Sequence, residues 1–118
     1  MKKIYHLSSC NTCQRIIKDL AVPNGFEFQD IKAEPISPAQ LEIMCQLAGS
    51  YEALFSKKAR KFRALQLNNT DLEETDYRDL IIKEYTFLKR PVIIINNKIF
   101  IGNSRKSVEA IKEYLGKN

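Results

Sequence analysis

Two cysteines separated by two residues are the part of this sequence best suited to chemistry. Cys10 and Cys13 stand in the segment Cys-Asn-Thr-Cys, and apolar residues at helical spacing follow it. At the first turn of a helix, this spacing brings two sulfurs within disulfide distance without bending the backbone. Unpaired amides and the helix dipole stabilise a thiolate at the first position, and the thiolate is the reactive species. The pattern therefore predicts that Cys10 is a nucleophile and that Cys13 resolves the mixed disulfide formed by Cys10.

Two other interpretations of the cysteine pair stay open. One such pair is half of a four-ligand zinc site, which only His6 and Cys45 could complete in this sequence. Alternatively, the two cysteines are incidental. Because a strand precedes the pair and a helix follows it, we favour thiol chemistry and expect no bound metal. Cys45 falls on the apolar face of another predicted helix, where a free cysteine packs as a small hydrophobe.

A strand, a helix and a second strand must position the pair. Apolar residues predict a buried strand over 2–8, a helix from Cys13 that stops before Pro23, and a short alternating strand over 26–31. The residues that carry these predictions are Ile4, Tyr5 and Leu7, then Ile16, Ile17 and Leu20, then Phe26, Phe28 and Ile31. His6 ends the first strand and points either toward the thiols or away from them, and the serines at 8 and 9 form the connecting loop.

The middle of the chain is predicted to be helical. Ser37-Pro38-Ala39-Gln40 is typical of a helix start, because Ser37 and Gln40 can form reciprocal capping bonds. The apolar face of that helix is Leu41, Met44, Cys45 and Ala48, with Gly49 as its C-terminal cap. A basic stretch follows, anchored by Leu54, Phe55, Phe62 and Leu65, and then a helical stripe of Tyr77, Leu80, Ile81 and Tyr85 with Thr75 as the expected cap.

The last third of the chain predicts a hairpin and a final helix. Val92–Ile95 and 98–102 are β-branched runs joined by Asn96-Asn97, which tolerate positive φ. Ser104 can cap a helix with the stripe Val108, Ile111, Tyr114 and Leu115, and Gly116 lies beyond its end. The predicted order is that of an α/β, thioredoxin-like domain spanning 1–118 with a helical insert at about 37–88.

Pro91, just before a strand, is expected to face the thiol loop in this fold, often through a cis bond. Arg90 would then be an anion contact or a neighbour of the thiolate. Alternatively, Arg90 is a surface arginine that follows Lys89.

Composition narrows the class of protein. The 118 residues are 44% hydrophobic and 28% charged, which suits one compact domain, and three cysteines are too few and odd in number for a disulfide framework. Neither a run of ~20 apolar residues nor a secretory signal is evident, so we expect a cytoplasmic protein with no membrane contact. We expect a monomer.

The net charge of +5 is ordinary for a small domain and does not predict direct nucleic-acid binding. Basic residues crowd 57–63 and acidic residues crowd 71–79, and we expect these runs to be solvated and partly to neutralise each other. A role in anion binding or partner docking is the alternative.

The chain resembles the arsenate reductase (ArsC)/Spx family of thioredoxin-like proteins. The resemblance rests on Ile4-Tyr5-His6 before the cysteine pair, on Lys89-Arg90-Pro91 followed by aliphatic residues, and on Gly102 after the hairpin. It covers nearly the whole chain. In the family's reductases, three arginines hold the oxyanion, and Arg90 matches one of them. The position of the first holds Ser56, with Lys57, Lys58 and Arg60 nearby, and the third falls near Gly102, with Arg105 as the nearby substitute.

The resemblance implies one of two functions. The reductases usually carry a serine where this chain has Cys13, whereas Spx regulators carry the cysteine pair as a disulfide switch that changes their binding to RNA polymerase. The polymerase-contacting glycine of Spx falls near Gly49 and Ser50. We interpret the chain first as an arsenate-reductase-like thiol-disulfide oxidoreductase, with a redox-switched regulator that binds RNA polymerase as the alternative.

In the enzyme interpretation, Cys10 attacks a disulfide, a glutathione adduct or an arsenate-like oxyanion, and Cys13 resolves the product. No cofactor is expected to stay bound, and glutathione, glutaredoxin or thioredoxin would be the cytosolic reductant. The expected catalytic residues are Cys10, Cys13 and Arg90. The expected substrate-binding residues are His6, Ser9, Asn11, Thr12, Arg60, Pro91 and Arg105.

Overall fold

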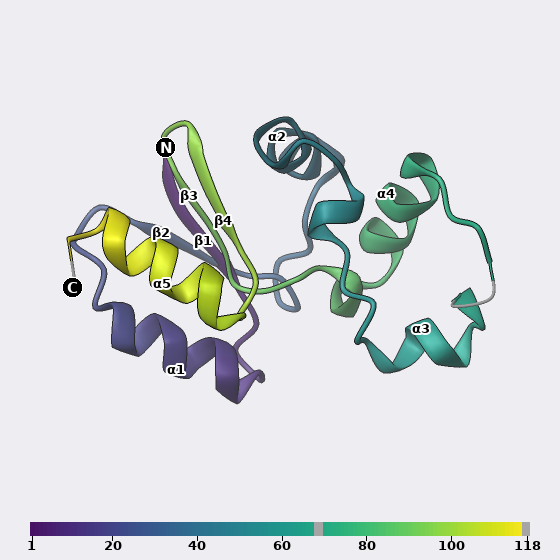
Figure 1. Cartoon of the computed structure of the whole chain (residues 1–118), viewed down its shortest axis with the longest axis horizontal. Coiled ribbons are helices and arrows are strands. Elements are labelled where there is room, and N and C mark those ends of the chain that lie inside the picture. Colours follow the sequence, from purple (N-terminus) through teal and green to yellow (C-terminus); the bar gives the residue numbers. More distant parts are fainter. Residues whose placement is uncertain (68–69, 117–118) are drawn as a thin grey trace. The chain divides into compact units, whose positions relative to one another are not determined.

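The structure, a computed structural model, describes residues 1–67 and 70–116. The chain divides into two compact units, one formed by residues 1–34 together with the chain from Arg90 onward, and the other by Pro35–Lys89. Figure 1 shows the elements of both units. The domain predicted over 1–118 also includes residues 68, 69, 117 and 118, which lie outside the described residues.

A mixed sheet forms the centre of the first unit. Within the described residues it has four strands in the order β2-β1-β3-β4. β1 (Lys2–His6) runs parallel to β2 (Glu27–Asp30) and antiparallel to β3 (Val92–Ile95), which pairs with β4 (Lys98–Ile101). The predicted hairpin is confirmed, and Asn96 makes its turn with a φ of 55°.

Two helices, α1 (Asn11–Leu20) and α5 (Arg105–Tyr114), cover one face of this sheet (Figure 1). Ser104 caps α5 as predicted, because its Oγ accepts a hydrogen bond from the Ser107 N–H at 3.2 Å. The buried core between helices and sheet consists of Ile4, Ile16, Leu20, Ile93, Ile95 and Ile111. Burial of these side chains packs α1 and α5 against the sheet.

The boundaries of the first strand and the first helix differ from the prediction. β1 ends at His6 rather than Ser8, and α1 begins at Asn11, so that Cys10 is its N-cap. In β2, Phe28 remains 52% exposed while Gln29 is almost fully buried. The alternation predicted this strand correctly, but Phe28 lies exposed on an edge strand of the sheet, and Gln29 Nε2 donates to the Glu34 carbonyl at 3.0 Å.

The second unit is helical, in agreement with the sequence. Its elements are α2 (Pro38–Ala48), η1 (Glu52–Leu54), α3 (Arg60–Ala64), α4 (Glu74–Lys83) and η3 (Tyr85–Phe87). The predicted capping box of α2 is present, since Ser37 Oγ accepts from the Gln40 N–H and Gln40 Oε1 accepts from the Ser37 N–H. Gly49 ends this helix with a φ of 95°, which favours glycine.

An aromatic cluster organises the second unit. The ring of Phe55 stacks on Phe87 at 5.0 Å between centroids and meets Tyr77 and Phe62 edge-on. Backbone bonds join the same segments, because the Lys89 N–H donates to the Leu54 carbonyl at 2.8 Å. Leu65, predicted as an anchor of this region, is instead 56% exposed.

The cap and the end of α4 also differ from the prediction. Glu73, not Thr75, caps α4, and it forms a capping box with Asp76. A glutamate can replace the expected threonine because its carboxylate also accepts the free amides of the first turn. α4 ends at Lys83, and Tyr85 belongs to η3 instead of the predicted stripe.

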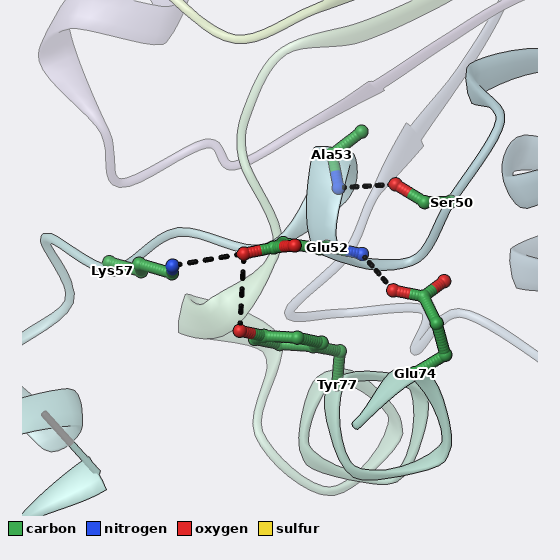
Figure 2. A network of polar contacts seen from close by, with 6 residues as sticks. All are labelled: Ser50, Glu52, Ala53, Lys57, Glu74 and Tyr77. Carbon is green, nitrogen blue, oxygen red and sulfur yellow. Dashed lines mark hydrogen bonds and ion pairs between the residues drawn. The ribbon is translucent and has the colours of Figure 1, made fainter. Parts of the chain in front are cut away.

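Carboxylates of the second unit tie its segments together (Figure 2). Glu52 accepts hydrogen bonds from Lys57 Nζ at 3.1 Å and from the Tyr77 hydroxyl at 3.3 Å. Glu74 accepts the Glu52 N–H at 3.1 Å, and the Ala53 N–H donates to Ser50 Oγ.

Two lysines of the basic run at 57–63 form salt bridges with carboxylates that lie outside the acidic run at 71–79. Lys57 pairs with Glu52, and Lys61 pairs with Glu84. Arg78 pairs with Asp79, which belongs to the acidic run itself. These two lysines therefore pair with carboxylates outside residues 71–79, and partial neutralisation of one run by the other stays a prediction.

Candidate active site

A tight turn connects β1 to α1 and carries the first cysteine. The Cys10 N–H donates to the Leu7 carbonyl at 3.0 Å, and the Gln14 N–H donates to the Cys10 carbonyl at 3.0 Å. The first bond closes a β-turn over residues 7–10, and the second is the first bond of the helix. Cys10 adopts an extended conformation as the N-cap, with φ −94° and ψ 106°. The cysteine therefore sits where the free amides of a helix N-terminus face outward.

The two thiols have different environments. Cys10 is half-buried, whereas Cys13 is completely buried in the first turn of α1. Burial raises the pKa of the Cys13 thiol, while a backbone hydrogen bond from Leu7 and the positive charge of Arg90 act in the opposite direction. Cys13 is therefore a protonated, enclosed thiol beside the more accessible Cys10.

Arg90 and Pro91 precede β3 in the same unit. The peptide bond between them is cis, and the Pro91 carbonyl accepts the Gly102 N–H at 2.9 Å. Pro91 is buried and Arg90 is half-buried. Arg90 lies within electrostatic range of the Cys13 thiol, whose pKa its positive charge lowers, and Cys10 acts on the same thiol.

Asp30, at the end of β2, holds the loop from one side, and sequence analysis missed it. Ser8 Oγ donates to Asp30 Oδ2 at 2.5 Å, and the backbone N–H groups of Ser8 and Lys32 donate to Asp30 Oδ1. The Ser8 hydroxyl is the main reason why the pKa of Asp30 lies below its ordinary value. One signal in the sequence could have predicted this role of Asp30: its carboxylate stands at the C-terminal end of the strand next to the thiol loop.

Gln14 holds the loop from the helix side, and it too was missed. Its Nε2 lies 2.9 Å from the Leu7 carbonyl oxygen and 3.0 Å from His6 Nδ1. The side chain thus links the end of β1, the turn and α1. No motif marks a glutamine for this role, although its position directly after the second cysteine was a usable hint.

The remaining predicted site residues occupy several positions. Ser9 and Asn11 are exposed and Thr12 is half-buried, all beside the thiols in sequence. Arg105 Nε donates to Glu109 Oε1 at 3.1 Å on the surface of α5. Arg60 begins α3 in the second unit and is exposed. In the described part of the chain, His, Cys, Asp and Glu side chains form no group of three that could hold a metal ion.

The sheet order, the helix with Cys10 as its N-cap and the cis-proline before β3 define a protein of the thioredoxin-like class. The whole chain resembles solved structures of that class. A protein called YffB superposes with a TM-score of 0.79 at 22% identity, over 98% of this chain and 99% of that chain. An arsenate reductase from Vibrio cholerae superposes with a TM-score of 0.73 at 15% identity, over 94% and 95% of the two chains.

The sequence comparison identifies the family. The model of the ArsC family matches residues 5–111, and the chain belongs to this family. The global transcriptional regulator Spx of Streptococcus pyogenes serotype M1 is 26% identical over 113 residues, which are 93% of this chain and 84% of the relative. Among the helices of the described residues, none is long and apolar enough to cross a membrane.

Proposed function

We propose that this protein is a thiol-disulfide oxidoreductase in which Cys10 is the nucleophile and Cys13 the resolving thiol. The observation that carries the proposal is the asymmetry of the pair, with Cys10 half-buried at the N-cap of α1 and Cys13 fully buried within its first turn. An accessible thiol at a helix N-terminus suits attack, while an enclosed thiol suits an intramolecular second step. Membership of the ArsC family supports thiol chemistry of this kind.

The proposed reaction has two steps. The Cys10 thiolate attacks one sulfur of a substrate disulfide, forming a mixed disulfide and expelling the other sulfur as a thiolate. Cys13 then loses its proton and attacks Cys10 Sγ, which releases the second substrate thiol and leaves a Cys10–Cys13 disulfide. The substrate gains two electrons and the protein loses two, so a thiol reductant such as glutathione, glutaredoxin or thioredoxin must reopen the disulfide. Arg90 offsets negative charge on the incoming group.

Trapping the mixed disulfide tests this mechanism directly. Reduced protein is incubated with a glutathione disulfide or, in parallel, with arsenate plus glutathione and glutaredoxin. We expect Cys13→Ser to accumulate a glutathione adduct on Cys10, as mapped by mass spectrometry, and Cys10→Ser to form none. Arsenite release that depends on Cys10 would place arsenate among the substrates. An adduct confined to Cys45 would overturn the proposal.

A redox-switched regulator is the second candidate function, and the similarity to Spx along nearly the whole chain favours it. In this proposal the same Cys10–Cys13 disulfide changes binding to RNA polymerase. Immobilised oxidised and reduced protein would be compared for retention of purified RNA polymerase. Redox-dependent retention without turnover of any small disulfide would favour the regulator.

The proposed chemistry bears on the compartment of the protein. A reopened dithiol requires a reducing compartment, so we propose the cytoplasm. We propose a monomer, which sedimentation of the reduced protein would test.

A further inference from the structure

The side-chain amide of Gln14 has an orientation that its hydrogen bonds determine. Nε2 lies 2.9 Å from the carbonyl oxygen of Leu7, which can only accept a hydrogen bond. If the amide were rotated by half a turn, two oxygens would face each other. The nitrogen, with its two N–H groups, therefore points toward Leu7.

This orientation determines the role of His6. The same Nε2 lies 3.0 Å from His6 Nδ1, and its second N–H is available for that contact. His6 Nδ1 must then accept, because an N–H at Nδ1 would face another donor. A neutral imidazole has one donor nitrogen and one acceptor nitrogen, so the proton sits on Nε2. An imidazolium, which has N–H groups at both nitrogens, does not fit this contact.

Other elements limit the movement of the His6 ring. The backbone carbonyl of His6 accepts a hydrogen bond from the Ile31 N–H at 2.9 Å, so the segment after β2 holds the backbone at His6. The exposed ring of Phe28, a diagonal neighbour on β2, meets the imidazole edge-on at 6.0 Å between centroids. Asp30, which pairs with His6 in the register, is the charged group on that strand that acts electrostatically with it.

We infer that Gln14 is a positioning residue: it holds His6 as the Nε2–H tautomer and closes the loop that presents Cys10. The geometric basis is that one amide nitrogen contacts both Leu7 and His6 while the Gln14 backbone N–H contacts Cys10. The Leu7 carbonyl accepts from both the Cys10 N–H and Gln14, so loss of the side-chain contact leaves the turn less constrained. The consequence for Cys10 reactivity rests on the proposed function, whereas the tautomer does not.

Nitrogen NMR of the imidazole tests the tautomer. His6 is the only histidine of the chain, so a protein made without a histidine tag and labelled with ¹⁵N-histidine gives one pair of ring signals. In alkaline buffer, we expect Nδ1 to have the shift of an unprotonated nitrogen and Nε2 that of an N–H. Averaged shifts, or a protonated Nδ1, would overturn the inference.

Two substitutions with opposite hydrogen-bonding character extend the test. Gln14→Glu removes both donors and presents acceptors, so we expect the proton to appear at Nδ1. Gln14→Lys keeps N–H donors, so the Nε2–H tautomer should persist. Gln46→Glu, at an exposed position of α2, is the matched control and should leave the His6 spectrum unchanged. An unchanged spectrum in Gln14→Glu would contradict the inference.

Reactivity of Cys10 separates positioning from a general structural role. We expect Gln14→Glu to slow alkylation of Cys10 by on the order of tenfold, as loss of a constraining hydrogen bond would, and Gln14→Lys to restore most of the rate. Equal slowing in both variants, or in neither, would overturn the positioning role. Failure of the oxidoreductase proposal would instead appear as missing turnover in a protein that retains the Nε2–H tautomer.

Discussion

The charge of Arg90 lowers the pKa of the Cys13 thiol, against the larger effect of burial, which raises it. The two residues are far apart in sequence, one at the first turn of α1 and the other just before the cis-proline. In the proposed mechanism, the charge of Arg90 therefore affects the rate at which Cys13 closes the disulfide.

Removal of this charge should slow the second step of the proposed reaction. In Arg90→Ala the pKa of Cys13 rises further, so less thiolate is present at neutral pH. We expect turnover to fall by roughly one to two decades, the equivalent of ~1.5–3 kcal/mol for a charge-assisted contact. Arg78→Ala, which removes an exposed cation of the second unit paired with Asp79, is the control and should leave turnover intact. Equal turnover in wild type and Arg90→Ala would contradict this role.

The pH profile of closure provides a second check on Cys13. Because its pKa is raised, the rate at which a Cys10 mixed disulfide is resolved should climb by roughly tenfold per pH unit through neutrality, since only the thiolate attacks. The rate should continue to rise beyond pH ~8.5, the pKa of an ordinary cysteine thiol. Stopped-flow measurement of the released thiol would record it. A plateau near neutral pH would indicate that Cys13 is already ionised.

Labelling should distinguish the three cysteines. Cys10 is half-buried at a helix N-terminus, Cys13 is fully buried, and the pKa of Cys45 is raised, chiefly by burial. We expect an alkylating agent at neutral pH to modify Cys10 first, as mapped by mass spectrometry. Preferential labelling of Cys45 would contradict the assignment of the nucleophile.

The Ser8–Asp30 contact should affect stability in a defined pH range. The pKa of Asp30 is lowered, chiefly by the Ser8 hydroxyl, so its contribution is present above the ordinary aspartate pKa of ~3.9 and is lost as the pH falls through the lowered value. The difference in unfolding free energy between wild type and Asp30→Asn should therefore be constant near neutral pH and shrink in acid. Ser8→Ala should remove part of the same contribution, and the double variant should be non-additive. A difference in unfolding free energy that grows as the pH falls would contradict this prediction.

Pairs of substitutions should show how much the buried core and the helix caps contribute to the unfolding free energy. Ile111→Ala, in the buried core of the first unit, should cost about 2–5 kcal/mol of unfolding free energy, whereas Ile82→Ala, at a 38% exposed position of α4, should cost much less. Ser37→Ala should cost about 1 kcal/mol, because it removes the cap of α2. Thr75→Ala should be nearly neutral, since Glu73 is the cap of α4. Denaturant titration would measure all four.

Local patterns in the sequence determined most elements of this protein. The hairpin at Asn96, the capping box at Ser37 and the cap at Ser104 depend on residues within a few positions of each other, so they could be predicted from types and spacing. The order of strands and helices followed from the same signals. The cysteine pair at a helix start was predictable for the same reason.

Only the tertiary structure decided which distant groups meet. Asp30 reaches Ser8, Gln14 reaches His6, and the charge of Arg90 acts on Cys13, and none of these relations is encoded by spacing. The exposure of Phe28 beside a buried Gln29 likewise depends on which strand lies at the sheet edge. Such contacts form because the order of strands in the sheet, and the packing of α1 on it, bring together segments that are remote in the chain. Their energetics depend on burial and on neighbouring charges, which a linear pattern does not specify.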